Sequence, residues 1–181
     1  ELLRPADLDL TDKNFEAALK GYQAVVLSSA SKMSSAEQAQ LYTTMGRARL
    51  GMGERDKAKA MVRRALEIDR MYEPAARYQL ELAEHGTPGE QAAALVEVAE
   101  LLGRRIPNLE GESRTEVEEE EIEVRRRAAA IYAESLNRPD EASRQLARVL
   151  ALRPTKQSVL HEVLELHTAA GEWRPATQVL E

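Results

Sequence analysis

Apolar residues recur along most of this chain at intervals of three and four positions, the spacing that places them on one face of an α-helix. In residues 14–27, for example, Phe15, Leu19 and Tyr22 share a face. The same spacing continues downstream with short polar interruptions. It predicts helices over residues 14–27, 36–50, 55–66, 74–84, 92–102, 116–136 and 142–150, and a last pair that begins near residue 157 and turns at Gly171.

The segments between these helices carry capping and turn residues. Ser34 or Ser35 is predicted to cap the second helix, with Glu37 completing a capping box in which side-chain and backbone groups exchange hydrogen bonds. Two stretches, residues 28–35 and 103–115, have the composition of loops and are longer than a usual connection. Both are expected to be insertions between helices.

The long helix predicted at residues 116–136 begins with an acidic run and continues with three arginines. Acidic side chains near the start of a helix interact favourably with its dipole. Glu121 with Arg125, and Glu123 with Arg127, have the four-residue spacing of ion pairs along a helix. The run is interpreted as a solvated helix start in preference to an acidic binding tail.

The sequence also has a period longer than that of a helix: a small residue is followed twelve positions later by an alanine, and this arrangement recurs along the chain. The pairs are Gly46 and Ala58, Ala130 and Ala142, and, with a larger first residue, Leu164 and Ala176. Ala142 and Ala176 are themselves 34 residues apart. Self-similarity at a period of about 34 residues indicates a repeat array. Two helices of a repeat approach closely only where small residues occupy their crossing.

With Tyr42, Met45, Gly46, Ala58 and Val62 at matching intervals, the chain resembles the tetratricopeptide repeat (TPR) family, whose unit is a helix, turn, helix of about 34 residues. A later unit matches more loosely through Ala129, Ala130, Ala133, Ala142 and Leu146. The resemblance implies an all-α fold, a right-handed α-solenoid of stacked antiparallel helix hairpins. About four to five units are expected, the first and last of them incomplete. A related solenoid of helical hairpins is the structural alternative.

The resemblance implies one solenoid domain over residues 1–181. Its approximate units are residues 1–35, 36–71, 72–103, 116–155 and 156–181, with the insertion loop at 103–115. Because the chain starts with Glu and its last helical pattern stops abruptly, we expect a fragment of a larger repeat-containing protein.

Composition narrows the functional classes. Apolar residues make up 43% of the 181 positions but aromatic residues only 4%, which favours a core of Ala, Leu and Val and disfavours a β-sandwich or barrel. A net charge of -6 argues against a general nucleic-acid binder, because such a surface is net basic. The mean hydropathy of -0.48 and the lack of a long apolar run argue against a membrane span. Without cysteine there are no disulfides or thiolate metal sites. The compartment stays open, with the cytoplasm favoured.

In the family that the chain resembles, the first helix of each unit lines a concave groove. The matching register assigns to this groove Gln40, Thr43, Thr44, Arg47, Arg77, Arg127, Ser158, His161, Glu162 and Glu165. Arg47, Arg77 and Arg127 are candidate anchors for carboxylate or phosphate groups, which suit the guanidinium fork. The alternative is that they are solvated arginines paired with nearby glutamates. One variant of the family grips a C-terminal carboxylate with lysines and asparagines, and the matching positions here do not support that clamp.

No catalytic or cofactor site is predicted. His161 and Glu165 share a helical face, but the zinc-protease pattern requires a second histidine where Glu165 stands, so a surface histidine is the favoured interpretation. The sequence has no glycine-rich phosphate loop, no cysteine nucleophile and no Ser-His-Asp set that the fold would bring together.

The sequence therefore favours a non-enzymatic protein-protein interaction scaffold that binds a peptide or partner domain in its concave groove. One alternative is a structural or oligomerisation spacer, in which terminal hairpins stack on other copies. Another is the regulatory module of an enzyme whose catalytic domain lies outside these residues. The expected partner is a protein or peptide, without nucleic acid or membrane insertion, and self-association through the terminal hairpins is a further option.

Overall fold

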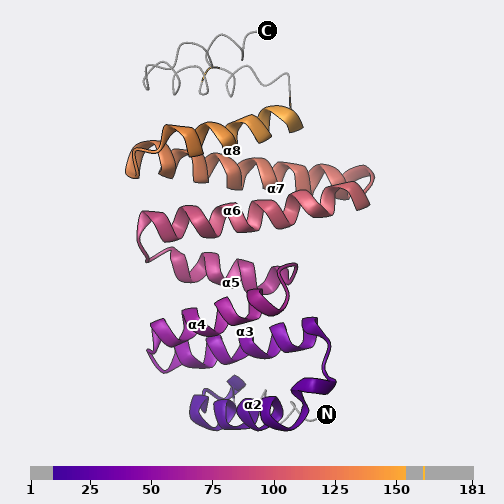
Figure 1. Ribbon diagram of the computed structural model, residues 1–181, viewed down its shortest axis with the longest axis vertical. Helices are drawn as coiled ribbons and strands as arrows, with labels where there is room; N and C mark the ends of the chain where they lie inside the picture. Colours follow the sequence, from indigo (N-terminus) through magenta and orange to yellow (C-terminus); the bar gives the residue numbers. More distant parts are fainter. Residues whose placement is uncertain (1–9, 154–160, 162–181) are drawn as a thin grey trace. The chain divides into compact units, whose positions relative to one another are not determined.

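The computed structural model describes residues 10–153 and residue 161, and these residues form helices without a β-strand (Figure 1). The α-helices are α2 (Phe15–Ser29), α3 (Ser35–Gly51), α4 (Arg55–Ile68), α5 (Glu73–Ala83), α6 (Pro88–Arg105), α7 (Gly111–Ala130) and α8 (Pro139–Leu152). Short turns of 3-10 helix form η1 (Ala30–Lys32) and η2 (Ile106–Asn108), and a π-helical turn forms η3 (Ile131–Ser135). The predicted all-α class is confirmed. The chain divides into two compact units, Glu1–Leu82 and Ala83–Glu181.

In the first unit, α3 and α4 form an antiparallel hairpin around the predicted glycine and alanine crossing (Figure 1). A Cβ built on Gly46 would lie 3.2 Å from Val62 Cγ2 and 3.3 Å from the carbonyl oxygen of Ala58. Gly46 therefore permits a close approach of the two helices that a larger residue would prevent. The apolar face of α2 covers α3 and completes a core of Ala18, Leu19, Tyr22, Val25, Leu41, Met45 and Ala48.

Local capping explains where α3 begins and ends. Ser34 Oγ accepts a hydrogen bond from the Glu37 amide at 3.3 Å, and the Ser34 amide donates to Glu37 Oε2 at 2.7 Å. The predicted capping box is confirmed, with Ser34 as the cap. At the other end, Gly53 has a φ of 77°, in the left-handed region where glycine is favoured. The turn between α3 and α4 is thus encoded by Gly53.

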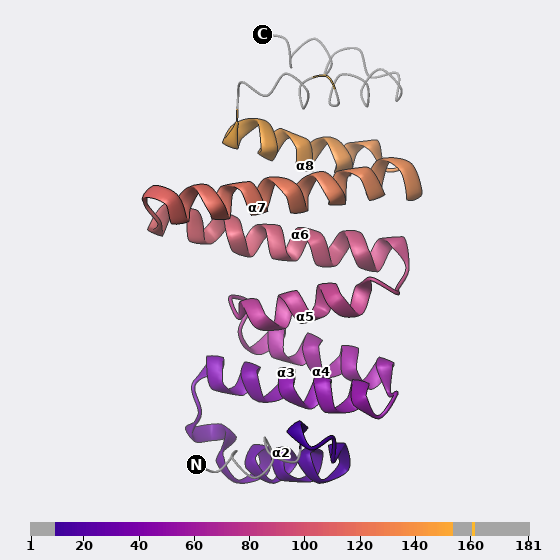
Figure 2. The ribbon, with the colours of Figure 1, turned by 180° about the vertical axis from the view of Figure 1, so that it is seen from behind.

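In the second unit, α6, α7 and α8 follow one another as antiparallel neighbours, with α7 packed against both others (Figure 2). A second capping box, between Thr87 and Glu90, starts α6. The turn predicted after residue 136 is confirmed by Asn137, whose φ of 52° is left-handed. The core between α7 and α8 contains Ile122, Ala129, Ala142, Leu146 and Val149.

Both segments predicted as loops are largely helical, so their predicted loop conformation is wrong, whereas their assignment as insertions in the repeat stays a prediction. Within residues 103–115, α6 continues to Arg105, η2 follows, and α7 already begins at Gly111. Ile106 is buried and directly precedes Pro107 in η2, so the proline marks a compact turn. Within residues 28–35, α2 extends to Ser29 and η1 follows. The division into repeat units stays a prediction, and the helix pair predicted from residue 157 lies outside the described residues except for residue 161.

Candidate functional site

The structure gives the predicted groove residues of α3 different environments. Gln40 and Arg47 are exposed. Thr43 is buried and its hydroxyl donates a hydrogen bond to the carbonyl oxygen of Ala39 at 2.7 Å, so it does not present its side chain to a ligand. The Thr44 hydroxyl likewise donates to the carbonyl oxygen of its own helix at Gln40, at 2.9 Å. Serine and threonine often bond to their own helix in this way.

The other predicted groove residues are spread over the chain. Arg77 is exposed on α5 in the first unit, and Arg127 is exposed on α7 in the second. His161 is exposed and helical. Ser158, Glu162 and Glu165 lie outside the described residues. Of the three candidate anchors, the structure brings together Arg47 and Arg77.

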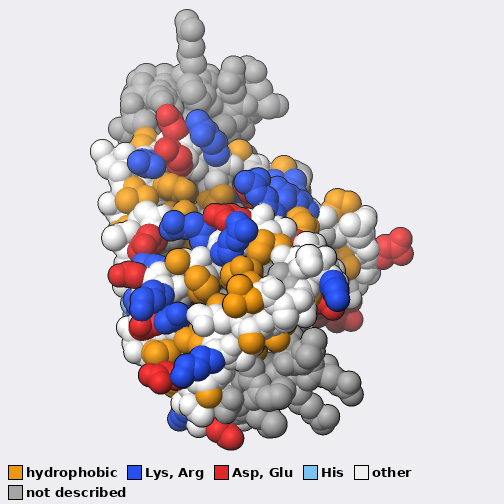
Figure 3. All heavy atoms as spheres, turned by 60° about the horizontal axis from the view of Figure 1, so that its bottom comes forward, with side chains coloured by type: hydrophobic (Ala, Val, Ile, Leu, Met, Phe, Trp, Pro, Cys, Tyr) orange, Lys and Arg blue, Asp and Glu red, His pale blue; other side chains and the backbone are white. Residues whose placement is uncertain are grey.

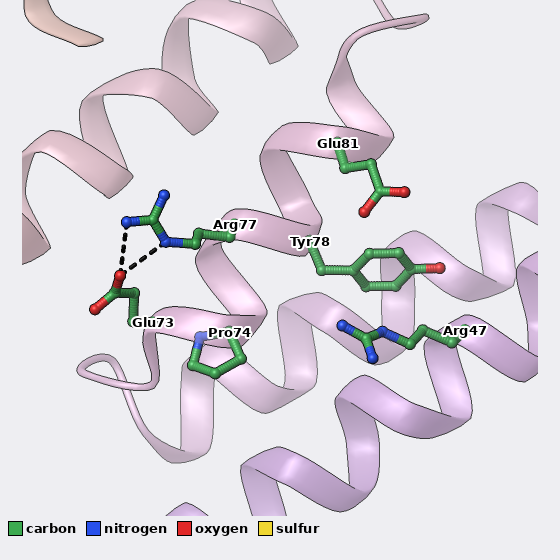
Figure 4. A pocket seen from close by; sticks show the side chains of 6 residues that line it. All are labelled: Arg47, Glu73, Pro74, Arg77, Tyr78 and Glu81. Atoms are coloured by element: carbon green, nitrogen blue, oxygen red, sulfur yellow. Dashed lines mark hydrogen bonds and ion pairs between the residues drawn. The ribbon is translucent and has the colours of Figure 1, made fainter. Parts of the chain in front are cut away.

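Arg47 and Arg77 line one hollow of about 340 Å³ in the first unit (Figure 4). Its wall is made by α3 and by successive turns of α5. The lining residues are Arg47, Glu73, Pro74, Arg77, Tyr78 and Glu81. Pro74 stands in the first turn of α5, where the missing amide proton is tolerated and the fixed φ suits a helix. The start of α5 is therefore set by the same residue that forms part of the hollow.

Tyr78 connects the hollow to the core of the first unit. Its Cε1 would lie 3.4 Å from a Cβ on Gly46, so the ring packs directly over the close crossing of α3 and α4. The side chain is buried, and its hydroxyl has no hydrogen-bond partner among the described residues. Burial, and secondarily the negative charge of Glu81, raises the pKa of Tyr78 above its usual value. The phenol is consequently neutral at physiological pH.

The charged side chains of the hollow fall into two kinds. Arg77 Nε and Nη2 both lie 2.7 Å from Glu73 Oε1, four residues earlier on α5. Arg47 instead places its guanidinium carbon 5.4 Å from the centroid of the Tyr78 ring, a cation-π contact. For Arg77 the interpretation as a paired surface arginine is supported. Arg47 is exposed and makes no ion pair within the described part of the chain, so its charge is available.

The wider surface is mixed in charge. On the face shown in Figure 3, Lys and Arg side chains are interspersed with Asp and Glu side chains and with small apolar areas. Over residues 10–153 and 161 no three His, Asp or Glu side chains are grouped so that they could hold a metal ion. None of the helices in that part of the chain combines the length and apolarity needed to span a membrane.

Sequence reasoning missed a buried ion-pair cluster in the second unit. Glu121 is fully buried, and its Oε1 accepts hydrogen bonds from Arg125 Nε at 2.7 Å and from Arg148 Nε at 3.1 Å. Arg125 Nη1 also donates to Gln145 Oε1 at 2.7 Å. We call Glu121, Arg125, Gln145 and Arg148 the Glu121 cluster. The predicted pair of Glu121 and Arg125 is confirmed, but the interpretation of the acidic run as entirely solvated is wrong.

A second carboxylate of the acidic run is also tied to α8. Glu118 accepts a hydrogen bond from Arg114 at 2.8 Å and one from Arg153 at 2.6 Å. These two contacts, with Arg114 the stronger, hold the pKa of Glu118 below its usual value. Because Arg153 follows α8, the pair fastens the end of α8 to α7. The Glu121 cluster and the contacts of Glu118 therefore have a structural role, since their charged groups bond to one another.

Comparison with known proteins finds likeness in structure only. No protein-family model matches the sequence, and no curated protein matches it. An assembly chaperone of RpL4 (Acl4) superposes with a TM-score of 0.54 at 15% identity, over 99% of this chain and 72% of that chain. MamA gives a TM-score of 0.49 at 12% identity, over 96% of this chain and 89% of that one. A putative kinesin light chain of Podosopora anserina with nearly identical TPR-like repeats gives 0.48 at 16% identity, over 99% and 90%.

At this level of identity the likeness concerns the fold. Together with the helical hairpins in each unit, it confirms the predicted α-solenoid class.

Proposed function

We propose that this chain is a non-enzymatic interaction module that binds a segment of a partner protein over α3 and α5, in the hollow that contains Arg47 and Tyr78. In the predicted repeat register, α3 and α5 are the first helices of successive units, the helices that line the groove of TPR proteins. Ligand sites of repeat proteins combine a rigid surface with side chains from several helices. The hollow has this composition, because Arg47 comes from α3 and the remaining lining residues come from α5.

The observation that carries this proposal is the contact between Arg47 and Tyr78. The tyrosine ring is buried over the crossing at Gly46, so it forms a fixed support. The guanidinium of Arg47 stacks on that support while its charge stays exposed. A side chain that is already positioned loses less conformational freedom when a ligand binds. Among the residues that line the hollow, Arg47 is therefore the best positioned to bind an anionic group of a partner.

The other two candidate anchors have smaller roles in this proposal. Glu73 already compensates the charge of Arg77, and Arg127 belongs to the second unit. Arg77 contributes to the shape of the hollow, and Arg47 contributes the contact with a negative charge.

A random peptide library displayed on phage, selected against the immobilised full chain, tests the proposal. Enriched peptides are synthesised with a fluorophore, and their Kd is measured by fluorescence anisotropy against the wild type, Arg47→Glu and a control, Arg63→Glu. Arg63 is also an exposed arginine of the first unit, but it lies on α4 and outside the hollow.

Reversing the charge of Arg47 replaces an attraction with a repulsion, each worth up to about 1 kcal/mol, so Kd is expected to rise about tenfold. Arg63→Glu is expected to leave Kd within about twofold of the wild type. If no peptide is enriched, or if Arg47→Glu binds the enriched peptides with the same Kd as Arg63→Glu, the hollow is not the binding site.

A further inference from the structure

We propose further that the hollow prefers a segment carrying both an acidic and a basic side chain over a purely anionic segment. This inference rests on the proposed function and names the class of ligand. It differs from the expectation that several arginines together would anchor carboxylates or phosphates. The reason lies in which charges of the hollow are already compensated.

The charges that line the hollow sum to zero. Two arginines, Arg47 and Arg77, face two glutamates, Glu73 and Glu81. Arg77 and Glu73 compensate each other through two nitrogen-oxygen contacts of 2.7 Å. Arg47 and Glu81 are both exposed, and in the described part of the chain neither forms an ion pair. One positive and one negative charge are therefore available to a ligand.

Tyr78 separates these two charges. In Figure 4 the Glu81 carboxylate and the Arg47 guanidinium lie on either side of the tyrosine ring. Glu81 follows Tyr78 by three residues, which is almost one turn of α5 and places the two side chains on the same face. Both charges act on the phenol, Glu81 raising its pKa and Arg47 lowering it. The two available charges therefore belong to one site and lie on either side of the buried Tyr78 ring.

A purely anionic ligand would compensate the charge of Arg47 but not that of Glu81. Its negative charges would meet Arg47, but they would also approach Glu81 and be repelled by it. A ligand with one charge of each sign meets Arg47 with its acid and Glu81 with its base. Each exposed pair contributes at most about fivefold to affinity, so both together favour the mixed ligand by up to about 25-fold over an uncharged one.

The charge preference of selected peptides tests this inference. The phage library is selected in parallel on the wild type, Arg47→Glu, Glu81→Lys and the double variant, with Asp56→Lys as the control. Asp56 is an exposed acid of α4 outside the hollow. Because Arg47 and Glu81 are exposed, their substitution should not prevent folding, and far-UV circular dichroism verifies this.

Peptides selected on the wild type are expected to share one acidic and one basic position. Glu81→Lys should convert the basic position to an acidic one, and Arg47→Glu should convert the acidic position to a basic one. The double variant should exchange the two. Selection on Asp56→Lys should resemble that on the wild type. Replacing the basic residue of a wild-type peptide by Gln should raise its Kd about fivefold for the wild type and lower its Kd for Glu81→Lys, because the introduced lysine repels the basic residue.

Three results would overturn the inference. If wild-type peptides are acidic without a shared basic position, or if Glu81→Lys selects the same sequences, the module binds peptides but prefers anions. If no peptide is enriched on any variant, the proposed function fails with it. If sedimentation shows concentration-dependent self-association that Arg47→Glu abolishes, a second copy of the chain occupies the hollow.

Discussion

Truncating Glu121 to alanine tests whether the Glu121 cluster holds the second unit together. The Glu121 side chain is fully buried, and one of its carboxylate oxygens accepts hydrogen bonds from two arginines, one on α7 and one on α8. The other oxygen, Oε2, has no hydrogen-bond partner among the described residues. Glu121→Ala therefore removes a negative charge from a site where positive charges remain.

The size of the effect depends on how much water reaches each arginine. The Arg125 side chain is only 11% exposed, so it stays buried without its carboxylate and keeps only its contact with Gln145. The Arg148 side chain is 42% exposed and can turn into solvent. Breaking a buried pair by removing one partner costs about 3–5 kcal/mol. With a single arginine left in a buried position, we expect Glu121→Ala to destabilise the second unit by about 3 kcal/mol.

Replacing both Glu121 and Arg125 should destabilise the second unit less than Glu121→Ala does. Apolar residues of similar volume often substitute for a buried ion pair without loss. The double variant Glu121→Leu with Arg125→Leu is therefore expected to lose less than about 1 kcal/mol. Glu123→Ala, on the exposed side of α7, serves as the control and should change stability by less than about 0.5 kcal/mol.

Hydrogen exchange of the α7 and α8 amides measures these changes in the second unit itself, and urea unfolding followed by circular dichroism measures them for the whole chain. A loss below about 1 kcal/mol for Glu121→Ala would refute the reasoning, because it would mean that solvent reaches Arg125 or that the pair contributes little. A double variant as unstable as the single variant would also refute it.

Three further predictions concern turns, helix packing and pH. Gly53→Ala should lower the free energy of unfolding by about 1 kcal/mol because Gly53 has a left-handed φ. Gly89→Ala, in the first turn of α6, should raise it by about 0.5 kcal/mol, because a Cβ there would meet only Thr87 Oγ1, at an ordinary contact distance of 4.0 Å. Urea titration of both variants measures the difference. Gly46→Leu should lower the thermal midpoint sharply, because overpacking at a close crossing costs about 1–3 kcal/mol, and an unchanged midpoint would contradict the packing described. Glu118 has a lowered pKa, so its contribution to stability is present above its unfolded pKa of about 4.3 and is lost as the pH falls through the lower folded value. Urea midpoints measured as a function of pH should show a shallower acid dependence for Glu118→Gln than for the wild type.

The helices could be predicted from the sequence because the information that places them is local. The capping box of Ser34 and Glu37 needs only residues three apart, and the apolar stripe of α2 needs only its own period. The error at residues 103–115 also has a local cause. Proline and glycine occur both in loops and in tight turns between helices, and burial of Ile106 selects the tight turn. Burial depends on residues distant in the sequence, which a local pattern does not contain.

The candidate site was only partly predictable for the same reason. The repeat register placed Arg47 and Arg77 on one surface, and the structure brings them into one hollow. Register alone did not reveal that Thr43 is buried or that Arg77 is paired with Glu73. Each of these outcomes depends on side-chain rotamers and on the neighbouring helix.

Gly103 shows what evidence for the buried carboxylate the sequence did contain. Glycine inside a helix costs about 1 kcal/mol relative to alanine, so an interior glycine requires a compensating reason. Gly103 lies within α6, and a Cβ at this position would be 3.1 Å and 3.2 Å from the two carboxylate oxygens of Glu121. The glycine therefore makes room for the acid, just as Gly46 makes room for α4. The pair of Glu73 and Arg77 has the same four-residue spacing as the pair of Glu121 and Arg125. Only the second pair is buried, because Gly103 of α6 and Arg148 of α8 lie against it. Spacing along one helix thus predicts that two charges can meet, whereas a glycine on the facing helix indicates that they meet in the interior.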